Sequence, residues 1–111
     1  MFYHVNTLIQ MTTRNDDWRN EDTTSLFEAV LALHSEEEAA AFFRDLCTLR
    51  ELEDLSHRWA VVRLLDEGRP YRQIAEDTGA STATVTRINQ WLQHGAGGYR
   101  LVLDRLRRRR K

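Results

Sequence analysis

The segment 71–92, YRQIAEDTGASTATVTRINQWL, constrains the fold of this chain more than any other segment. Four of its residues recur at i, i+3, i+4 and i+7, the spacing of one helix face: Tyr71, Ile74, Ala75 and Thr78. Gly79 would end that helix, because glycine adopts the left-handed backbone without a side-chain clash. Ser81 is a favourable N-cap for a second helix. The segment therefore predicts two short helices joined by a tight turn.

The spacing within this segment is that of a helix-turn-helix. The second helix would present an inward apolar stripe of Val85, Ile88 and Leu92. A small Ala75 lets that helix cross closely, and the pattern Ala-x3-Gly-x5-Val places a glycine in the turn. In a helix-turn-helix the second helix can enter a DNA major groove. The alternative is an ordinary helical hairpin with a glycine turn.

The outward face of the second helix favours the DNA-binding interpretation. It carries small hydroxyl, methyl and basic side chains: Ser81, Thr82, Ala83, Thr84, Thr86 and Arg87. Short side chains allow a helix to lie close to base edges, and a methyl group can contact the methyl of thymine. No acidic residue occurs between Asp77 and Asp104, so this helix itself has no side chain that repels phosphate.

Charge is divided unevenly along the chain, although the formal net charge is only −1. Residues 1–68 contain 6 Arg and 14 acids, which gives −8; residues 69–111 contain 9 Arg, one Lys and 3 acids, which gives +7. A basic half that contains a helix-turn-helix is typical of a nucleic-acid-binding protein, whereas the alternative is chance clustering of solvated charges. The run RRRRK at 107–111 is either a solvated helix end or a phosphate-contacting tail.

The rest of the chain predicts an all-α fold, because no stretch alternates for long with period two. Three pairs have capping-box spacing and predict helix starts: Ser25 with Glu28, Ser35 with Glu38, and Thr48 with Glu51. They predict helices over about 24–33, from 35 onward and over 48–67, and a last helix begins near Tyr99. The helix over 48–67 is apolar on more than one side, which in so small a chain suggests subunit contact.

The chain therefore reads as one helical domain over 23–106, with the helix-turn-helix at 71–92. A flexible, solvated lead occupies 1–22, within which Met11 is a second candidate for the native start, and a basic tail occupies 107–111. No segment has the length of a membrane span or the pattern of a signal peptide, so we expect a cytoplasmic protein without membrane contact.

Catalytic and metal-binding arrangements are not evident in the sequence. Cys47 is the single cysteine, and its apolar neighbours predict a small buried side chain rather than a disulfide or metal ligand. The four histidines have no metal-ligand spacing, and there is no catalytic triad pattern or glycine-rich phosphate loop. We therefore predict a protein that is not an enzyme and needs no cofactor or metal.

The order of these elements resembles the YerC/YecD branch of the Trp-repressor-like superfamily. The resemblance covers residues 24–106, and its most specific parts are GASTATVTR and the R-x4-R-L-L-x2-G run at 58–68. It implies an intertwined all-α homodimer with a helix-turn-helix in the C-terminal half, bound to double-stranded DNA with two related half-sites. It also implies a DNA contact for Arg72 and a reading role for Thr82, Ala83, Thr84 and Thr86.

The same resemblance places Thr48, Arg58 and Arg87 in a corepressor pocket. Ile88 stands where the tryptophan repressor has a small glycine beneath the indole, and Trp91 stands where it has a serine. Both differences add bulk, so we expect that tryptophan is not the corepressor; the sequence identifies no other effector.

The leading functional hypothesis is a homodimeric, sequence-specific transcriptional regulator, most simply a repressor. The alternative from another class is a helical module that uses the same fold to bind a protein, which the acidic first half would suit. Binding of structured RNA is the weaker third hypothesis, because the reading helix has no exposed aromatic platform for stacking bases.

Overall fold

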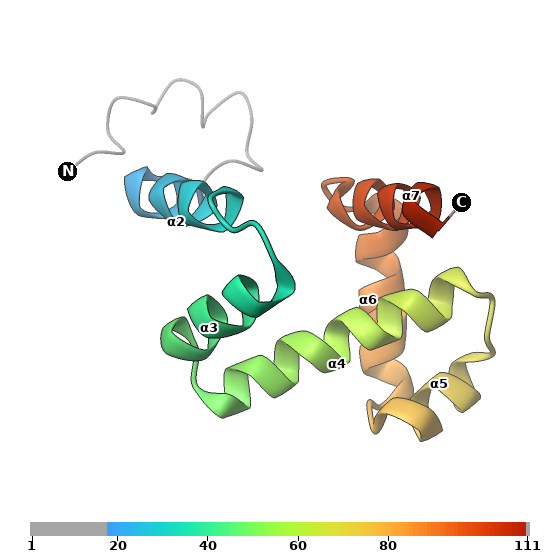
Figure 1. Cartoon of the computed structure of the whole chain (residues 1–111). Helices are drawn as coiled ribbons and strands as arrows, with labels where there is room; N and C mark the ends of the chain where they lie inside the picture. Colours follow the sequence, from blue (N-terminus) through green and yellow to red (C-terminus); the bar gives the residue numbers. More distant parts are fainter. Residues whose placement is uncertain (1–17, 111) are drawn as a thin grey trace. The chain divides into compact units, whose positions relative to one another are not determined.

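The computed structural model describes residues 18–110, and all regular secondary structure in that range is α-helical (Figure 1). The helices are α2 (Glu21–Leu31), α3 (Glu36–Leu46), α4 (Leu49–Asp66), α5 (Tyr71–Thr78), α6 (Thr82–His94) and α7 (Gly98–Arg110). The predicted all-α class is confirmed. The chain divides between Leu46 and Cys47 into two compact units.

The first unit contains α2 and α3. Helix α2 begins at Glu21, because Asn20 and Thr23 form a reciprocal capping box in which each side chain accepts the other residue's backbone N–H at 2.9 Å. The prediction that Ser25 and Glu28 cap a helix starting near 24 was wrong, since an earlier asparagine satisfies the first-turn amides. Residues 1–17 of the predicted lead lie outside the described residues.

Helix α3 starts as predicted after Ser35, whose hydroxyl accepts the Glu38 N–H at 3.1 Å. The Glu38 carboxylate accepts the backbone N–H of His34 at 2.8 Å instead of that of Ser35. Phe42 and Phe43 make an edge-to-face pair with centroids 5.5 Å apart. Neither α2 nor α3 contains a buried residue within the single chain, so their apolar side chains remain available for other contacts.

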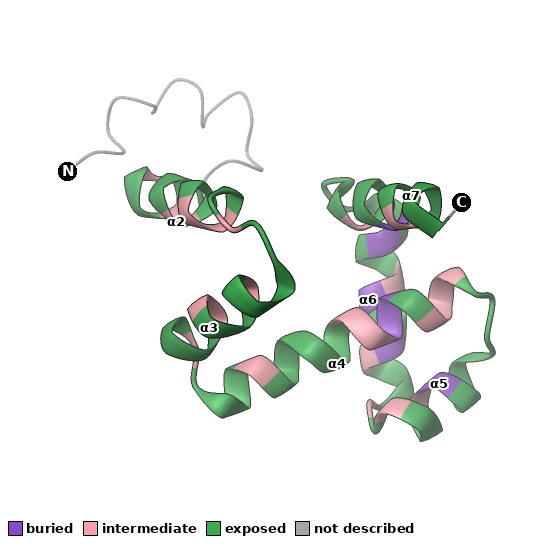
Figure 2. Ribbon diagram, viewed as in Figure 1, coloured by how far each residue is buried: buried purple, intermediate pink, exposed green. Residues whose placement is uncertain are grey.

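The second unit has its own core, formed where α4, α5, α6 and α7 meet. Helix α4 begins with the predicted capping box of Thr48 and Glu51. The core consists of seven buried apolar residues: Val61, Val62, Ile74, Val85, Ile88, Leu92 and Leu103. Figure 2 shows that these positions are concentrated in the second half of α4 and along α6. The first half of α4 keeps Leu49 and Leu55 exposed.

Helix α6 crosses α4 and carries another helix at each of its ends (Figure 1). Helix α5 lies by the N-terminal end of α6, and α7 lies across its C-terminal end. Leu103 of α7 is buried in the core, and Tyr99 stacks at a tilt on Trp59 of α4 with centroids 6.2 Å apart. Helix α7 continues through Arg110, so the predicted basic tail is helical over 107–110.

Two further expectations concern single features of the described residues. Cys47 is only half-buried, in the bend before α4, so the prediction of a buried side chain was wrong. Across residues 18–110, no helix combines the length and the apolar character that crossing a membrane requires.

Candidate nucleic-acid interface

The turn between α5 and α6 is fixed by short-range hydrogen bonds. Gly79 has φ +79°, and its N–H donates to the Ala75 carbonyl at 2.9 Å. The Thr78 hydroxyl donates to the Ile74 carbonyl at 2.7 Å and accepts the Ala80 N–H at 3.2 Å. These bonds satisfy the Ala75 carbonyl at the end of α5 and the Ala80 amide of the turn, and they hold the two helices at one relative orientation.

Helix α6 is anchored at its start and along its inner face. The Ser81 hydroxyl accepts the Thr84 N–H at 3.1 Å, which confirms Ser81 as the N-cap. Val85, Ile88 and Leu92 are 0%, 3% and 4% exposed, as the predicted stripe requires. Burial on one face leaves the opposite face of α6 to solvent.

The exposed face of this helix-turn-helix carries most of the side chains predicted to contact DNA: Arg72, Ser81, Thr82, Ala83, Thr86 and Arg87. Helix α6 has no acidic residue, and its N-terminus bears the partial positive charge of the helix dipole. The Thr86 hydroxyl donates to the Thr82 carbonyl at 2.9 Å, which leaves its oxygen able to accept a hydrogen bond. The exposed surface of α6 therefore has mostly short side chains over its first turns and no acidic side chain.

Thr84 lies differently from its neighbours, because it is half-buried. Its hydroxyl oxygen accepts from the Ser81 hydroxyl at 3.0 Å and from Arg87 Nη2 at 3.4 Å. Thr84 thus connects the N-cap to the guanidinium of Arg87. Within the proposed interface it is suited to orienting Arg87 as well as to contacting a base.

Within the single chain, the residues assigned to a corepressor pocket by resemblance do not form one cluster. Arg58 and Ile88 line a cavity of about 170 Å³ between α4 and α6, together with Asp54, His57, Val61, Ala80 and Thr84. Thr48 instead caps α4, ten residues before Arg58 and thus about 15 Å away along the helix. Arg87 is exposed and bonded to Thr84. Ile88 forms part of the wall of this small cavity, and the wall also includes the polar side chains of Asp54 and Arg58.

Trp91 lines a separate apolar groove of about 510 Å³. The groove is also lined by Trp59, Tyr99 and Val102, together with residues 95–98. Trp91 is 47% exposed and Val102 is 43% exposed. Much of the apolar surface of α6 and α7 therefore remains uncovered in the single chain.

The sequence matches the Trp repressor protein family over residues 21–107, which include all six helices down to the last turn of α7. The chain belongs to this family. The match confirms the predicted resemblance, and it places the helix-turn-helix described above inside a recognised family fold.

This member of the Trp repressor family is similar to another protein in sequence and to two solved structures in both sequence and fold. The chain is 41% identical over 92 residues to the uncharacterized protein YerC of Bacillus subtilis (strain 168), covering 83% of this chain and 88% of that protein. A crystal structure of a TrpR-like protein from Eubacterium eligens ATCC 27750 has a TM-score of 0.77 and 44% identity, covering 82% and 94% of the two chains. A candidate Trp repressor from Staphylococcus aureus has a TM-score of 0.77 and 39% identity, covering 83% and 92%.

One charged cluster was not anticipated from the sequence. Arg107 of α7 contacts Asp66 at the end of α4, and these residues are 41 positions apart in the chain. Hydrogen bonding to the Asp66 carboxylate, and then its charge, raise the pKa of the Arg107 guanidinium above its ordinary value. The only signal available beforehand was the helical spacing that places Arg107 on the same face as Leu103.

Proposed function

We propose that this protein is a homodimeric, sequence-specific DNA-binding transcriptional regulator, acting in the cytoplasm as a repressor. The main observation behind this proposal is the exposed face of α6, which has no acidic residue and carries small side chains over its first turns. The Ser81 N-cap and the buried inner face fix α6 within the helix-turn-helix. A helix with this surface fits against base edges in a major groove. Membership of the Trp repressor protein family supports the same assignment.

Different residues would contribute different parts of DNA recognition. Arg72 is exposed in the first turn of α5, where a cation would contact phosphate and add affinity without sequence preference. Thr82, Ala83 and Thr86 are exposed along the first turns of α6 and would read base edges. Arg87, held by Thr84, would reach either a phosphate or a guanine.

Homodimer formation is supported by the apolar surface that one chain leaves uncovered. Helices α2 and α3 contain no buried residue. Leu31, Leu49 and Leu101 are 81%, 62% and 49% exposed, and the groove beside Trp91 adds further apolar area. Burying this exposed apolar surface against another chain would be favourable. A second copy that covers it would also supply the second reading helix for a two-part operator.

Regulation by free tryptophan is not part of the proposal. The cavity beside Ile88 measures about 170 Å³, below the range of about 300–1,000 Å³ that is typical of small-molecule sites. Thr48 and Trp91 lie outside this cavity. Such a regulator would bind DNA without an effector, or it would respond to a smaller or different effector.

Selection of bound sequences from a random pool of duplex DNA tests the central claim. We expect an enriched site with two related halves whose centres lie about 10 base pairs, one helical turn, apart. Sedimentation at micromolar concentration should give a dimer. A folded monomer would contradict the oligomeric state, and failure to enrich any sequence would contradict DNA recognition.

Single substitutions then test the residue assignments on the selected site. Arg72→Ala should weaken binding to all sequences alike and make the dependence on salt shallower, because one phosphate contact is lost. Thr86→Val keeps the side-chain shape but removes the hydroxyl, and it should alter preference at one base pair by about 1–3 kcal/mol. Arg108→Ala is the matched charge control, since it lies on α7, and it should reduce the affinity and the salt dependence less than Arg72→Ala does. Parent-like behaviour of both α5 and α6 variants would show that the interface is wrongly assigned.

A further inference from the structure

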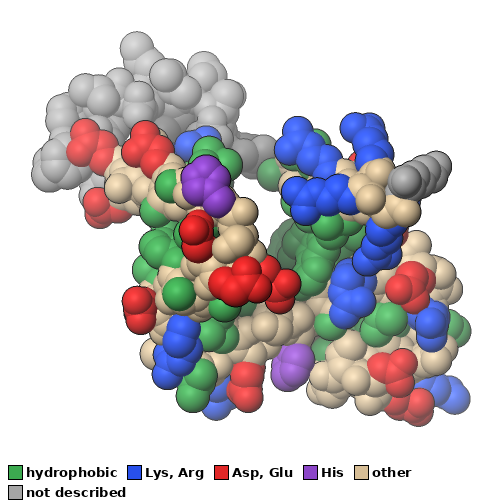
Figure 3. Space-filling model, viewed as in Figure 1, with side chains coloured by type: hydrophobic (Ala, Val, Ile, Leu, Met, Phe, Trp, Pro, Cys, Tyr) green, Lys and Arg blue, Asp and Glu red, His purple; other side chains and the backbone are tan. Residues whose placement is uncertain are grey.

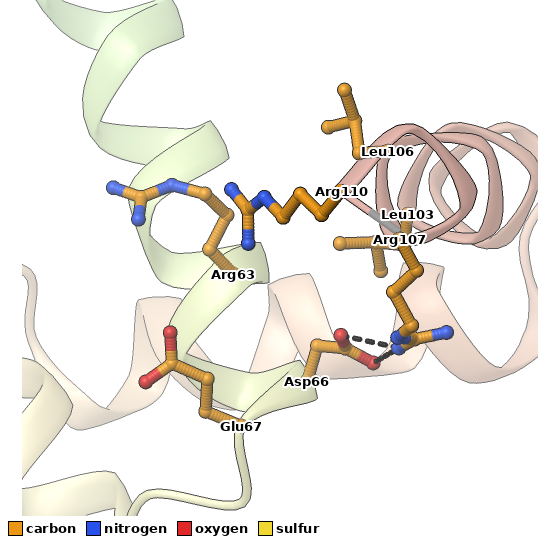
Figure 4. A pocket seen from close by; sticks show the side chains of 7 residues that line it. All are labelled: Arg63, Asp66, Glu67, Leu103, Leu106, Arg107 and Arg110. Carbon is orange, nitrogen blue, oxygen red and sulfur yellow. Dashed lines mark hydrogen bonds and ion pairs between the residues drawn. The ribbon is translucent and has the colours of Figure 1, made fainter.

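A second charged site lies between the C-terminal ends of α4 and α7. The space there measures about 310 Å³ and is lined by three arginines, Arg63, Arg107 and Arg110 (Figure 4). Arginine side chains also gather over α7 in the space-filling view (Figure 3). Helix α7 lies by the C-terminal end of α6, whereas the reading surface is formed at its N-terminal end (Figure 1). This cavity is therefore separate from the proposed DNA-reading surface.

Helix periodicity selects which of the terminal arginines enter the cavity. Four lining residues recur at i, i+3, i+4 and i+7 on one face of α7: Leu103, Leu106, Arg107 and Arg110. Arg108 and Arg109 follow the same helix but do not line the cavity. Two of the four terminal arginines of α7 therefore face α4. If the run only carried solvated charge at a helix end, no such arrangement would be needed.

Both carboxylates that line the cavity are already engaged by arginines. Arg107 Nη2 lies 2.6 Å and 2.5 Å from the two oxygens of Asp66, and Arg100 Nη1 lies 3.8 Å from the same carboxylate. Glu67 pairs with Arg69 at 3.2 Å. The acidic groups of the lining therefore have their charge compensated without the use of Arg63 or Arg110.

The guanidinium groups of Arg63 and Arg110 have no hydrogen-bond or ion-pair partner among residues 18–110. Arg63 stands on α4, and Arg110 extends from α7 toward α4 (Figure 4). Two cations around one partly enclosed space repel each other, and an anion between them would reverse that interaction. Leu103, which is 6% exposed, and Leu106 form an apolar part of the wall, which strengthens any charge pairing there.

We propose that this cavity is a binding site for a phosphate group, with Arg63 and Arg110 as its guanidinium ligands. The planar guanidinium donates two parallel hydrogen bonds that match the oxygens of a phosphate. A volume of about 310 Å³ lies at the small end of ligand sites and suits a diphosphate-sized group. The phosphate belongs either to a free phosphorylated small molecule or to a nucleic-acid backbone outside the reading surface.

Calorimetric titration of the full chain with pyrophosphate at constant ionic strength tests the site. We expect one pyrophosphate per chain. Arg63→Gln and Arg110→Gln should each weaken binding by about ten- to a hundredfold, the effect of losing one hydrogen bond to a charged group. Arg108→Gln and Arg109→Gln remove the same charge outside the cavity and should change affinity by no more than about twofold.

A second titration with random-sequence duplex DNA distinguishes the two sources of phosphate. Duplex binding that Arg63→Gln weakens more than Arg108→Gln does assigns the site to a nucleic-acid backbone. Duplex binding unchanged by Arg63→Gln, together with weakened pyrophosphate binding, assigns it to a free phosphorylated ligand. Absence of pyrophosphate binding at millimolar concentration, or an equal loss in all four variants, would overturn the proposal. All four side chains are exposed, and circular dichroism would verify that each variant is folded.

Discussion

Ile74→Ala should destabilise the helix-turn-helix strongly, because Ile74 is the only buried residue of the eight-residue helix α5. The side chain is 0% exposed and belongs to the core of the second unit. Its truncation removes two methyl groups and a methylene group, worth together about 2.4 kcal/mol of transfer free energy. The cavity left behind adds to this loss, so the free energy of unfolding should fall by about 3–4 kcal/mol, within the range measured for such substitutions.

Urea unfolding followed by circular dichroism measures this loss. All samples should have one protein concentration, since the stability of the proposed dimer would depend on concentration. Gln73→Ala is the matched control: Gln73 is the exposed neighbour of Ile74 on α5, and its truncation should change the free energy of unfolding by less than about 0.5 kcal/mol. A loss below about 1 kcal/mol for Ile74→Ala, or an equal loss for Gln73→Ala, would refute the view that this side chain anchors α5.

Two further predictions concern the turn and the cavity. Gly79→Ala should cost about 1–2 kcal/mol and lower the melting temperature, because a side chain is disfavoured at φ +79° even though the surrounding space is open. Gly98→Ala, at an equally open position without that backbone strain, should not lower it, and equal melting temperatures for the two variants would contradict the argument. L-tryptophan at millimolar concentration should release no binding heat and leave the melting temperature unchanged; a clear rise would show that the folded state binds it.

Local signals in the sequence were sufficient for much of the fold. Gly79, Ser81 and the capping pair Thr48 and Glu51 were located correctly, because each acts through hydrogen bonds to residues no more than four positions away. The stripe of Val85, Ile88 and Leu92 followed from helical period alone. Capping also produced the error at α2, since Asn20 with Thr23 satisfies the first-turn amides as well as the predicted serine and glutamate could.

The predicted sites divide according to how far apart their members lie in the chain. The exposed residues of α6 follow one another along a single helix, so helical period was enough to place them on one face. Arg58 and Ile88 share a cavity, but Thr48 caps α4 and Trp91 lines another groove. A resemblance names the residues of a pocket but not the distances between them in this chain. Those distances depend on how α4 and α6 cross.

The sequence by itself determined most of the helices, the caps at Thr48 and Ser81, and the polar face of α6, because these depend on interactions within one or two helical turns. Only the tertiary structure decided which charges meet. Asp66 pairs with Arg107 across 41 residues, and that pairing leaves Arg63 and Arg110 around a common cavity. Packing of α7 against α4 sets these contacts. Helical periodicity relates only residues within a few turns, so it could not predict an ion pair between residues 41 positions apart.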